Sequence, residues 1–115
     1  MNGGLHAGDP VRLVLTTCPD EAVARSLALA LVEERLAACG NVVPGIASIY
    51  RWKGSIETEG EALLLLKTTA GRVPALSERL GELHPYDVPE LLELEVERGA
   101  TAYLRWVVEE TGGGS

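Results

Sequence analysis

The chain contains no phenylalanine, and aromatic residues make up only 4% of its 115 residues. Proteins that bind single-stranded nucleic acid stack bases on aromatic side chains, so this scarcity argues against that class. Positive charge is scarce as well: 10 Lys and Arg stand against 17 Asp and Glu, a formal net charge of −7. Because nucleic acids and anionic membranes both attract basic surfaces, neither is expected as a partner.

Long hydrophobic runs and a cysteine framework are also absent. No apolar run reaches the roughly 18 residues that a membrane-spanning helix needs. The first ten residues lack the basic start and apolar centre of a secretory signal. Cys18 and Cys39 are too far apart for a CxxC site and are expected to be free thiols. The sequence therefore predicts a cytoplasmic protein.

The remaining composition is typical of a globular domain, with 46% hydrophobic and 23% charged residues. A single core usually serves about 100 to 200 residues, so we expect one domain. We assign this domain to residues 11–110, between a flexible tail at 1–10 and a flexible glycine-rich tail at 111–115.

The first part of the chain predicts a strand followed by a helix. Residues 11–17 (VRLVLTT) form a short β-branched and aliphatic run, and the Pro-Asp pair that ends at Asp20 is typical of a helix start. Apolar residues recur at helical spacing from Asp20 to Cys39, and Gly40 suits the position past a helix end. We predict a helix over 20–39, with Cys39 as a buried thiol at its end.

A long β-hairpin is predicted next, with residues 41–52 and 55–69 on either side of a Lys53-Gly54 turn. About 12 residues at about 3.3 Å each make a strand roughly 40 Å long. A compact chain of this size is only about 35 Å across, so the hairpin tip is expected to overhang the domain. Apolar strand edges invite aggregation unless another subunit covers them. The hairpin therefore predicts a homo-oligomer.

The second part of the chain predicts a helix, a strand and a further helix. An amphipathic helix is expected over 72–84, stopped by Pro85, and the Leu/Glu alternation at 92–96 indicates a strand with one buried face. After Gly99, Thr101 can cap a short terminal helix. The order β-α-β-β-α-β is that of the ferredoxin-like sandwich, an α+β fold in which helices cover one face of an antiparallel sheet.

The chain offers no catalytic motif, and we expect no enzymatic activity. GxSxG, P-loop and GxGxxG patterns are all absent. Thiol and imidazole groups suit copper, zinc and related ions, which makes Cys18, Cys39 and His84 candidate metal ligands. Cys18 precedes a helix start, where the positive end of the helix favours thiolate. An equally good interpretation is a small apolar residue that fills space at a strand end.

The segment HPYDVPE, which begins at His84, is the densest group of polar and aromatic residues in the chain. Its prolines favour an extended loop, and loops on rigid scaffolds often carry function. Alternatively, His84 stabilises the helix end and Tyr86 packs against it. Lys67 follows an apolar run and should need a carboxylate partner, for which Glu61 and Glu90 are candidates; the three could also face a ligand together.

Several stretches of the chain resemble the divalent-cation-tolerance CutA family, over about residues 11–110. The matching stretches are TTCPDEAVA, ALVEERLAACGNVVPG, SIYRWKGSIE, LLLLKTT, ELHPYDVPEL and YLRWV. The resemblance implies a cytosolic homotrimer of ferredoxin-like subunits, similar in architecture to the PII signalling proteins. This agrees with the oligomer expected from the hairpin.

The resemblance also implies binding of copper or another divalent transition metal, a part in metal tolerance, and no organic cofactor. Copper-binding members place a cysteine near the end of the first strand and a His-His pair before Pro-Tyr. In this chain Thr16 stands at the cysteine position, with Cys18 two residues later, and Leu83 replaces the first histidine. His84 and Cys18 are therefore the expected metal ligands.

A second hypothesis follows from the same resemblance. Trp52, Lys67, Tyr86 and Glu90 match family positions that are similar to an intersubunit cleft for a small anionic ligand. By analogy with PII proteins, the chain would then be a ligand-binding signalling module. A third hypothesis is a trimeric interaction scaffold.

Overall fold

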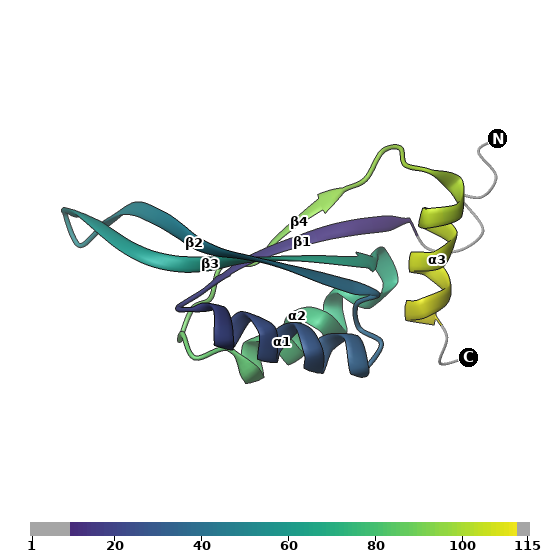
Figure 1. Ribbon diagram of the computed structural model, residues 1–115, viewed down its shortest axis with the longest axis horizontal. Helices are drawn as coiled ribbons and strands as arrows, with labels where there is room; N and C mark the ends of the chain where they lie inside the picture. Colours follow the sequence, from purple (N-terminus) through teal and green to yellow (C-terminus); the bar gives the residue numbers. More distant parts are fainter. Residues whose placement is uncertain (1–9, 113–115) are drawn as a thin grey trace.

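The computed structural model describes residues 10–112, and the order of its elements is the order predicted from the sequence (Figure 1). The tails expected at 1–10 and 111–115 lie outside the described residues, apart from Pro10, Thr111 and Gly112. No helix within residues 10–112 is long and apolar enough to cross a membrane. The elements are β1 Val11–Cys18, α1 Glu21–Glu33, β2 Cys39–Trp52, β3 Ser55–Thr69, the 3-10 turn η2 Ala70–Arg72, α2 Val73–Leu83, β4 Leu92–Glu95 and α3 Thr101–Gly112.

The four strands form one antiparallel sheet in the order β2-β3-β1-β4. Helices α1 and α2 lie side by side on one face of this sheet, and α3 packs at the end where β1 begins (Figure 1). The ferredoxin-like arrangement predicted from the element order is therefore confirmed.

Helix α1 is shorter than the sequence predicted. It begins as expected, because the Asp20 carboxylate accepts a hydrogen bond from the Val23 amide at 2.9 Å. It ends at Glu33, where Arg35 adopts a left-handed conformation with φ 60°. The predicted helix end at Cys39 was wrong, since Cys39 is the first residue of β2. The apolar pattern continues past the helix because the following alanines are buried in the connecting loop.

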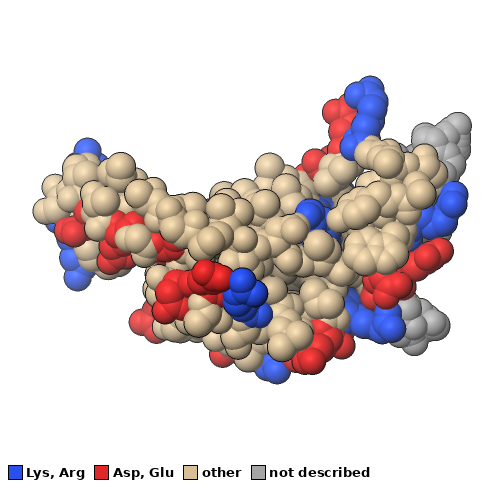
Figure 2. All heavy atoms as spheres, in the orientation of Figure 1, with Lys and Arg blue, Asp and Glu red and all other residues tan. Residues whose placement is uncertain are grey.

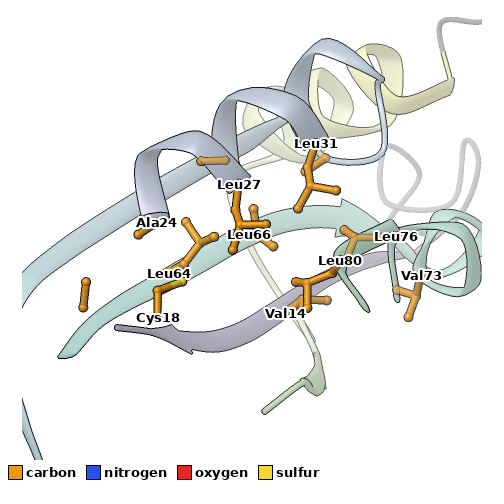
Figure 3. Packing of buried hydrophobic residues seen from close by; sticks show 13 residues of the cluster. Val14, Cys18, Ala24, Leu27, Leu31, Leu64, Leu66, Val73, Leu76 and Leu80 are labelled. Carbon is orange, nitrogen blue, oxygen red and sulfur yellow. The ribbon is translucent and has the colours of Figure 1, made fainter. Parts of the chain in front are cut away.

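The main core lies between the sheet and helices α1 and α2 (Figure 3). Side chains from β3 fill its centre, and each fully buried leucine contributes about 1.5–3 kcal/mol relative to exposure. The residues labelled in this core are Val14, Cys18, Ala24, Leu27, Leu31, Leu64, Leu66, Val73, Leu76 and Leu80. A smaller cluster joins α3 to the start of β1 through Val11, Ala38, Leu104 and Val107.

The opposite face of the sheet carries six leucines, which we call the open leucine face. The register pairs Leu13 with Leu94 and Leu15 with both Leu65 and Leu92, so these side chains share one face. Leu63 lies two residues before Leu65 on β3 and completes the set. The prediction of a buried face on β4 was wrong for the single chain: Leu92 and Leu94 are 53% and 43% exposed, because no element within residues 10–112 covers them.

The hairpin overhangs the rest of the molecule, as its length predicted. The chain measures 49 × 25 × 22 Å, and β2 and β3 project together beyond the helices (Figure 1). Both turn residues, Lys53 and Gly54, have positive φ, which suits a tight hairpin turn. Apolar side chains of the projecting part are exposed, including Ile49 at 69% and Ile56 at 60%.

Helix α3 extends into the segment that the sequence assigned to a tail. It ends at Gly112, and two arginines donate hydrogen bonds to carbonyls of its last turn. Arg35 Nη1 lies 3.0 Å from the Glu110 carbonyl oxygen, and Arg72 Nε lies 2.7 Å from that of Thr111. These bonds satisfy acceptors that have no partner inside the helix, and they explain why it continues beyond residue 110.

Candidate functional site

The loop that begins at His84 lies against the end of β1. The His84 imidazole is only 6% exposed, and its Nε2 donates to the Thr17 carbonyl oxygen at 2.8 Å. The Tyr86 amide donates to Nδ1 of the same ring at 3.1 Å. Because a carbonyl can only accept and an amide N–H can only donate, these contacts fix a neutral ring with its proton on Nε2. Both ring nitrogens are therefore in use.

Tyr86 connects this loop to the base of the hairpin. Its hydroxyl donates to Glu61 Oε2 at 2.6 Å, and its ring lies 4.8 Å from the His84 ring, centroid to centroid. Burial, followed by the hydrogen bond to Glu61, raises the pKa of Tyr86 above its ordinary value. Tyr86 therefore remains a neutral hydrogen-bond donor at physiological pH.

Cys18, the last residue of β1, is fully buried. Burial and then the charges of Glu61 and Asp20 raise the pKa of the Cys18 thiol to about 11. The expectation that the helix start favours a thiolate was wrong, because desolvation and two carboxylates outweigh the partial positive charge of the helix end. The side chain is a neutral thiol.

Glu90 lies at the far end of the loop, where it accepts a long hydrogen bond from Thr17 Oγ1 at 3.5 Å. His84, Tyr86 and Glu90 are thus held at one end of the sheet by contacts with Thr17 and Glu61. Cys18 follows Thr17 at the same end of β1, with its side chain in the core. We call this group, with Thr17 and Glu61, the sheet-end cluster.

Sequence reasoning did not assign Glu61 to this cluster, because the sequence pointed to it only as a partner for Lys67. The signal that could have found it is the strand register: Cys18 pairs with Ala62, which places the neighbouring Glu61 beside the end of β1.

Lys67 lies away from the sheet-end cluster. It is five residues beyond Ala62 on β3, about 17 Å along the strand. Its ammonium group donates a hydrogen bond to Asn41 Oδ1. The prediction of a carboxylate partner, Glu61 or Glu90, was therefore wrong. An amide on the adjacent strand takes that place.

Trp52 lies farther still, at the hairpin tip, where it pairs with Ser55 and is 59% exposed. The Lys53 ammonium lies 5.7 Å from the centroid of its ring. The four residues expected to bind an anionic ligand therefore do not meet within one chain.

The two positions that depart from the copper-binding pattern have different environments. Thr16 is fully buried on the core side of β1, and its hydroxyl has no hydrogen-bond partner within residues 10–112. Leu83 is 37% exposed and, together with Val23 and Pro85, lines a small cavity of about 240 Å³ between α1 and the end of α2.

The other thiol, Cys39, is only partly buried, so the expected core position was wrong. It lines a shallow apolar groove of about 540 Å³ with residues of α1 and Trp106, and its Sγ lies 3.6 Å from Asn41 Oδ1. This position on the first residue of β2 places Cys39 apart from Cys18 and His84.

Carboxylates line the hairpin strand that leads to the sheet-end cluster. Glu57, Glu59 and Glu61 alternate along β3 and therefore share one face of the hairpin. Figure 2 shows carboxylates gathered along the hairpin and basic side chains near its tip. A surface of this sign attracts cations.

The donor types in the cluster suit a transition metal, since imidazole, thiol and carboxylate groups are all present. In the conformation described, however, both His84 nitrogens are hydrogen-bonded and the Cys18 thiol is protonated. No three His, Cys, Asp or Glu side chains converge as a metal site within residues 10–112. The arrangement is a closed one, and His84 can accept a metal only after a hydrogen bond to its ring breaks.

Comparison with known proteins identifies relatives along nearly the whole chain. Residues 12–110 match the family model described as CutA1 divalent ion tolerance protein. The divalent-cation tolerance protein CutA of Thermus thermophilus is 55% identical over 100 residues, which cover 87% of this chain and 97% of that protein. The mouse protein CutA is 46% identical over 110 residues, covering 96% of this chain but only 62% of the longer mouse protein.

Solved structures give the same result. The divalent cation tolerance protein from Thermus thermophilus aligns with a TM-score of 0.86 at 54% identity, covering 89% of this chain and 99% of that one. CutA from Xylella fastidiosa also aligns with a TM-score of 0.86, at 46% identity, covering 89% of this chain and 98% of that one. The chain therefore belongs to the CutA1 family of divalent ion tolerance proteins.

Proposed function

We propose that the chain acts in divalent-cation tolerance as a non-catalytic, cytosolic homotrimer that binds a transition metal, copper(II) first of all, at the sheet-end cluster. The observation that carries the metal proposal is that an imidazole, a thiol and two carboxylates, from β1, β3 and the loop, lie at the same end of the sheet. Family membership supports a relation to divalent cations, and the acidic face of the hairpin supplies a field that concentrates them.

The exposed apolar surface supports assembly of several copies. The open leucine face leaves Leu92 and Leu94 largely exposed, and the outer edges of β2 and β4 have no neighbouring strand within residues 10–112. An uncovered leucine face beside free strand edges is costly in water and prone to aggregation unless other subunits cover it. Cyclic assembly covers both features at once.

Metal binding in this proposal begins from the closed arrangement. Within the cluster His84 is the donor that is released most easily, because it needs only to lose one hydrogen bond, whereas Cys18 must lose its proton. The carboxylates of Glu61, on β3, and of Glu90, at the end of the loop, are available as oxygen donors. Imidazole with carboxylate oxygen is a donor set that copper(II) accepts.

Equilibrium dialysis of the tag-free protein against Cu(II) and Zn(II) tests the proposal. The variant His84→Gln keeps an N–H that can donate to the Thr17 carbonyl but removes the imidazole. We expect its copper affinity to fall by at least about tenfold. Lys67→Ala, which alters a residue outside the cluster, should leave the affinity unchanged.

Two results would contradict the metal role: a wild-type protein that takes up no copper, or a His84→Gln variant that binds as tightly as the wild type. If Lys67→Ala instead abolished binding of a small anion, the signalling-module hypothesis would replace the metal hypothesis.

A further inference from the structure

The loop from His84 to Glu90 is attached to the sheet near its two ends and exposed in its middle. Val88 is 88% exposed, and Asp87 is exposed beside it. The attachments are the His84 contact with the Thr17 carbonyl, the Tyr86 contact with Glu61 and the Thr17 contact with Glu90. The second is the shortest of the three and involves a charged acceptor, so it is expected to be the strongest.

Tyr86 and His84 are coupled through the backbone as well as through their rings. The Tyr86 amide donates to His84 Nδ1, while the Tyr86 hydroxyl holds Glu61. Pro85 stands between them and limits the backbone freedom of the loop. The bond of the hydroxyl to Glu61 restrains the Tyr86 side chain and, through it, the Tyr86 amide beside Nδ1. If the hydroxyl leaves Glu61, this restraint is lost, and Nδ1 has a free lone pair whenever the amide moves away.

We propose that the Tyr86–Glu61 hydrogen bond is a latch that keeps the loop closed and His84 unavailable, and that a divalent cation opens it by competing with Tyr86 for the Glu61 carboxylate. Tyr86 and Glu61 are therefore positioning residues. The carboxylates of Glu57 and Glu59, on the same face of β3 as Glu61, concentrate cations beside the latch. The opening by a cation rests on the proposed function, whereas the closure of the loop stands on the contacts alone.

Hydrogen exchange in the metal-free protein tests the closure. Tyr86→Phe removes the donor and keeps the ring, so the backbone amide at position 86, which is bonded to His84 Nδ1, should exchange about tenfold faster. Tyr103→Phe, a matched change on α3, should leave the loop amides unchanged. An amide at position 86 that exchanges at the wild-type rate in Tyr86→Phe would overturn the latch.

A double-mutant cycle then tests whether Glu61 is the partner. Glu61→Met, which keeps the side-chain length but removes the acceptor, should also speed exchange. The double variant Tyr86→Phe/Glu61→Met should exchange no faster than Tyr86→Phe, because both changes break the same bond. If the increases in exchange rate of the two single variants multiply in the double variant, the two residues act independently. That result would overturn the assignment of Glu61 as the partner of Tyr86.

Copper(II) dialysis separates the latch from the metal proposal. If the latch restrains His84, Tyr86→Phe should bind copper up to about tenfold more tightly than the wild type, because less free energy is spent on opening. Faster loop exchange with unchanged copper affinity would overturn the control of His84 by the latch. Faster exchange in a protein that binds no copper at all would leave the closure confirmed and the proposed function, with its cation trigger, contradicted.

Discussion

Two buried threonines show what a single hydrogen bond contributes in this core. Thr16 and Thr68 are both fully buried on the core side of the sheet. The Thr68 hydroxyl donates to the Leu36 carbonyl oxygen at 2.7 Å, whereas that of Thr16 has no partner within residues 10–112. A buried hydroxyl without a partner costs free energy that the unfolded chain, which is hydrated, does not pay.

Thr16→Val is therefore expected to raise the free energy of unfolding by about 1 kcal/mol, because it replaces the unpartnered hydroxyl by a methyl group of similar size. The matched change Thr68→Val should lower it by about 1 kcal/mol, since it leaves the Leu36 carbonyl without its donor. Urea unfolding of both variants measures the two differences. A destabilised Thr16→Val protein would show that the hydroxyl has a partner after all.

Cys18 gives the protein a pH-dependent stability. The pKa of this thiol is 9.0 in an ordinary environment and about 11 in the fold. Between these values the unfolded chain loses the thiol proton and the folded chain keeps it, so the folded state binds more protons and stability falls as pH rises. The stabilisation is fully present below pH 9 and disappears towards pH 11.

Urea unfolding from pH 8 to 11 measures this dependence. The decline should amount to roughly 2–3 kcal/mol for a shift of this size. It should be smaller in Cys18→Ala, which lacks this thiol. Equal slopes for the two proteins would contradict a protonated, buried thiol.

The sequence was enough to find most of the sheet-end cluster but not its contacts. The segment that begins at His84 contains Tyr86 and Glu90, and their chemistry is visible in the sequence. Which groups they touch depends on strand register and on the path of the loop, neither of which follows from local pattern. Glu61 was therefore not identified as the partner of Tyr86, and the predicted partner of Lys67 was wrong.

At the scale of the elements, apolar periodicity predicted correctly which helices and strands are present, but it placed their ends poorly. Helix α1 stops at Glu33 although the apolar pattern continues, because a left-handed Arg35 turns the chain and the next alanines enter the core from a loop. Helix α3 continues past residue 110 because distant arginines satisfy its last carbonyls. Both ends are set by tertiary contacts, which spacing along the sequence does not encode.

The two arginines at the end of α3 give a prediction for that helix. Arg72→Met keeps much of the side-chain length but removes the donor to the Thr111 carbonyl, so the last turn of α3 should exchange its amide hydrogens faster. The free energy of unfolding should fall by about 1 kcal/mol. Arg105→Met, on the exposed side of the same helix, is the control and should change neither quantity. An equal effect of both substitutions would mean that the loss of charge, and not the hydrogen bond, is responsible.

At the scale of the whole molecule, the open leucine face separates what one chain can do from what an assembly can do. The leucines of β4 were predicted to be buried. In the single chain, however, Leu92 and Leu94 are exposed. The alternation was recognised correctly, but no element within residues 10–112 covers this face. In the proposed assembly, a second chain supplies what the fold lacks.

Leu94→Asp is expected to shift the protein from trimer towards monomer, because it places a carboxylate on a face that other subunits cover in the proposed assembly. Ala75→Asp adds the same charge on the outer side of α2 and should leave the mass unchanged. Light scattering at several micromolar concentrations measures both. An undiminished trimer in Leu94→Asp would place the interface elsewhere.

The most direct test of the account is the mass of the wild-type, tag-free protein in solution, because its central claim is that one chain is an incomplete unit. Light scattering should give three times the chain mass of 12.2 kDa, and this value should persist on dilution to low micromolar concentration. A stable monomer of 12.2 kDa would contradict the account, since it would leave the leucine face and the overhanging hairpin permanently exposed to water.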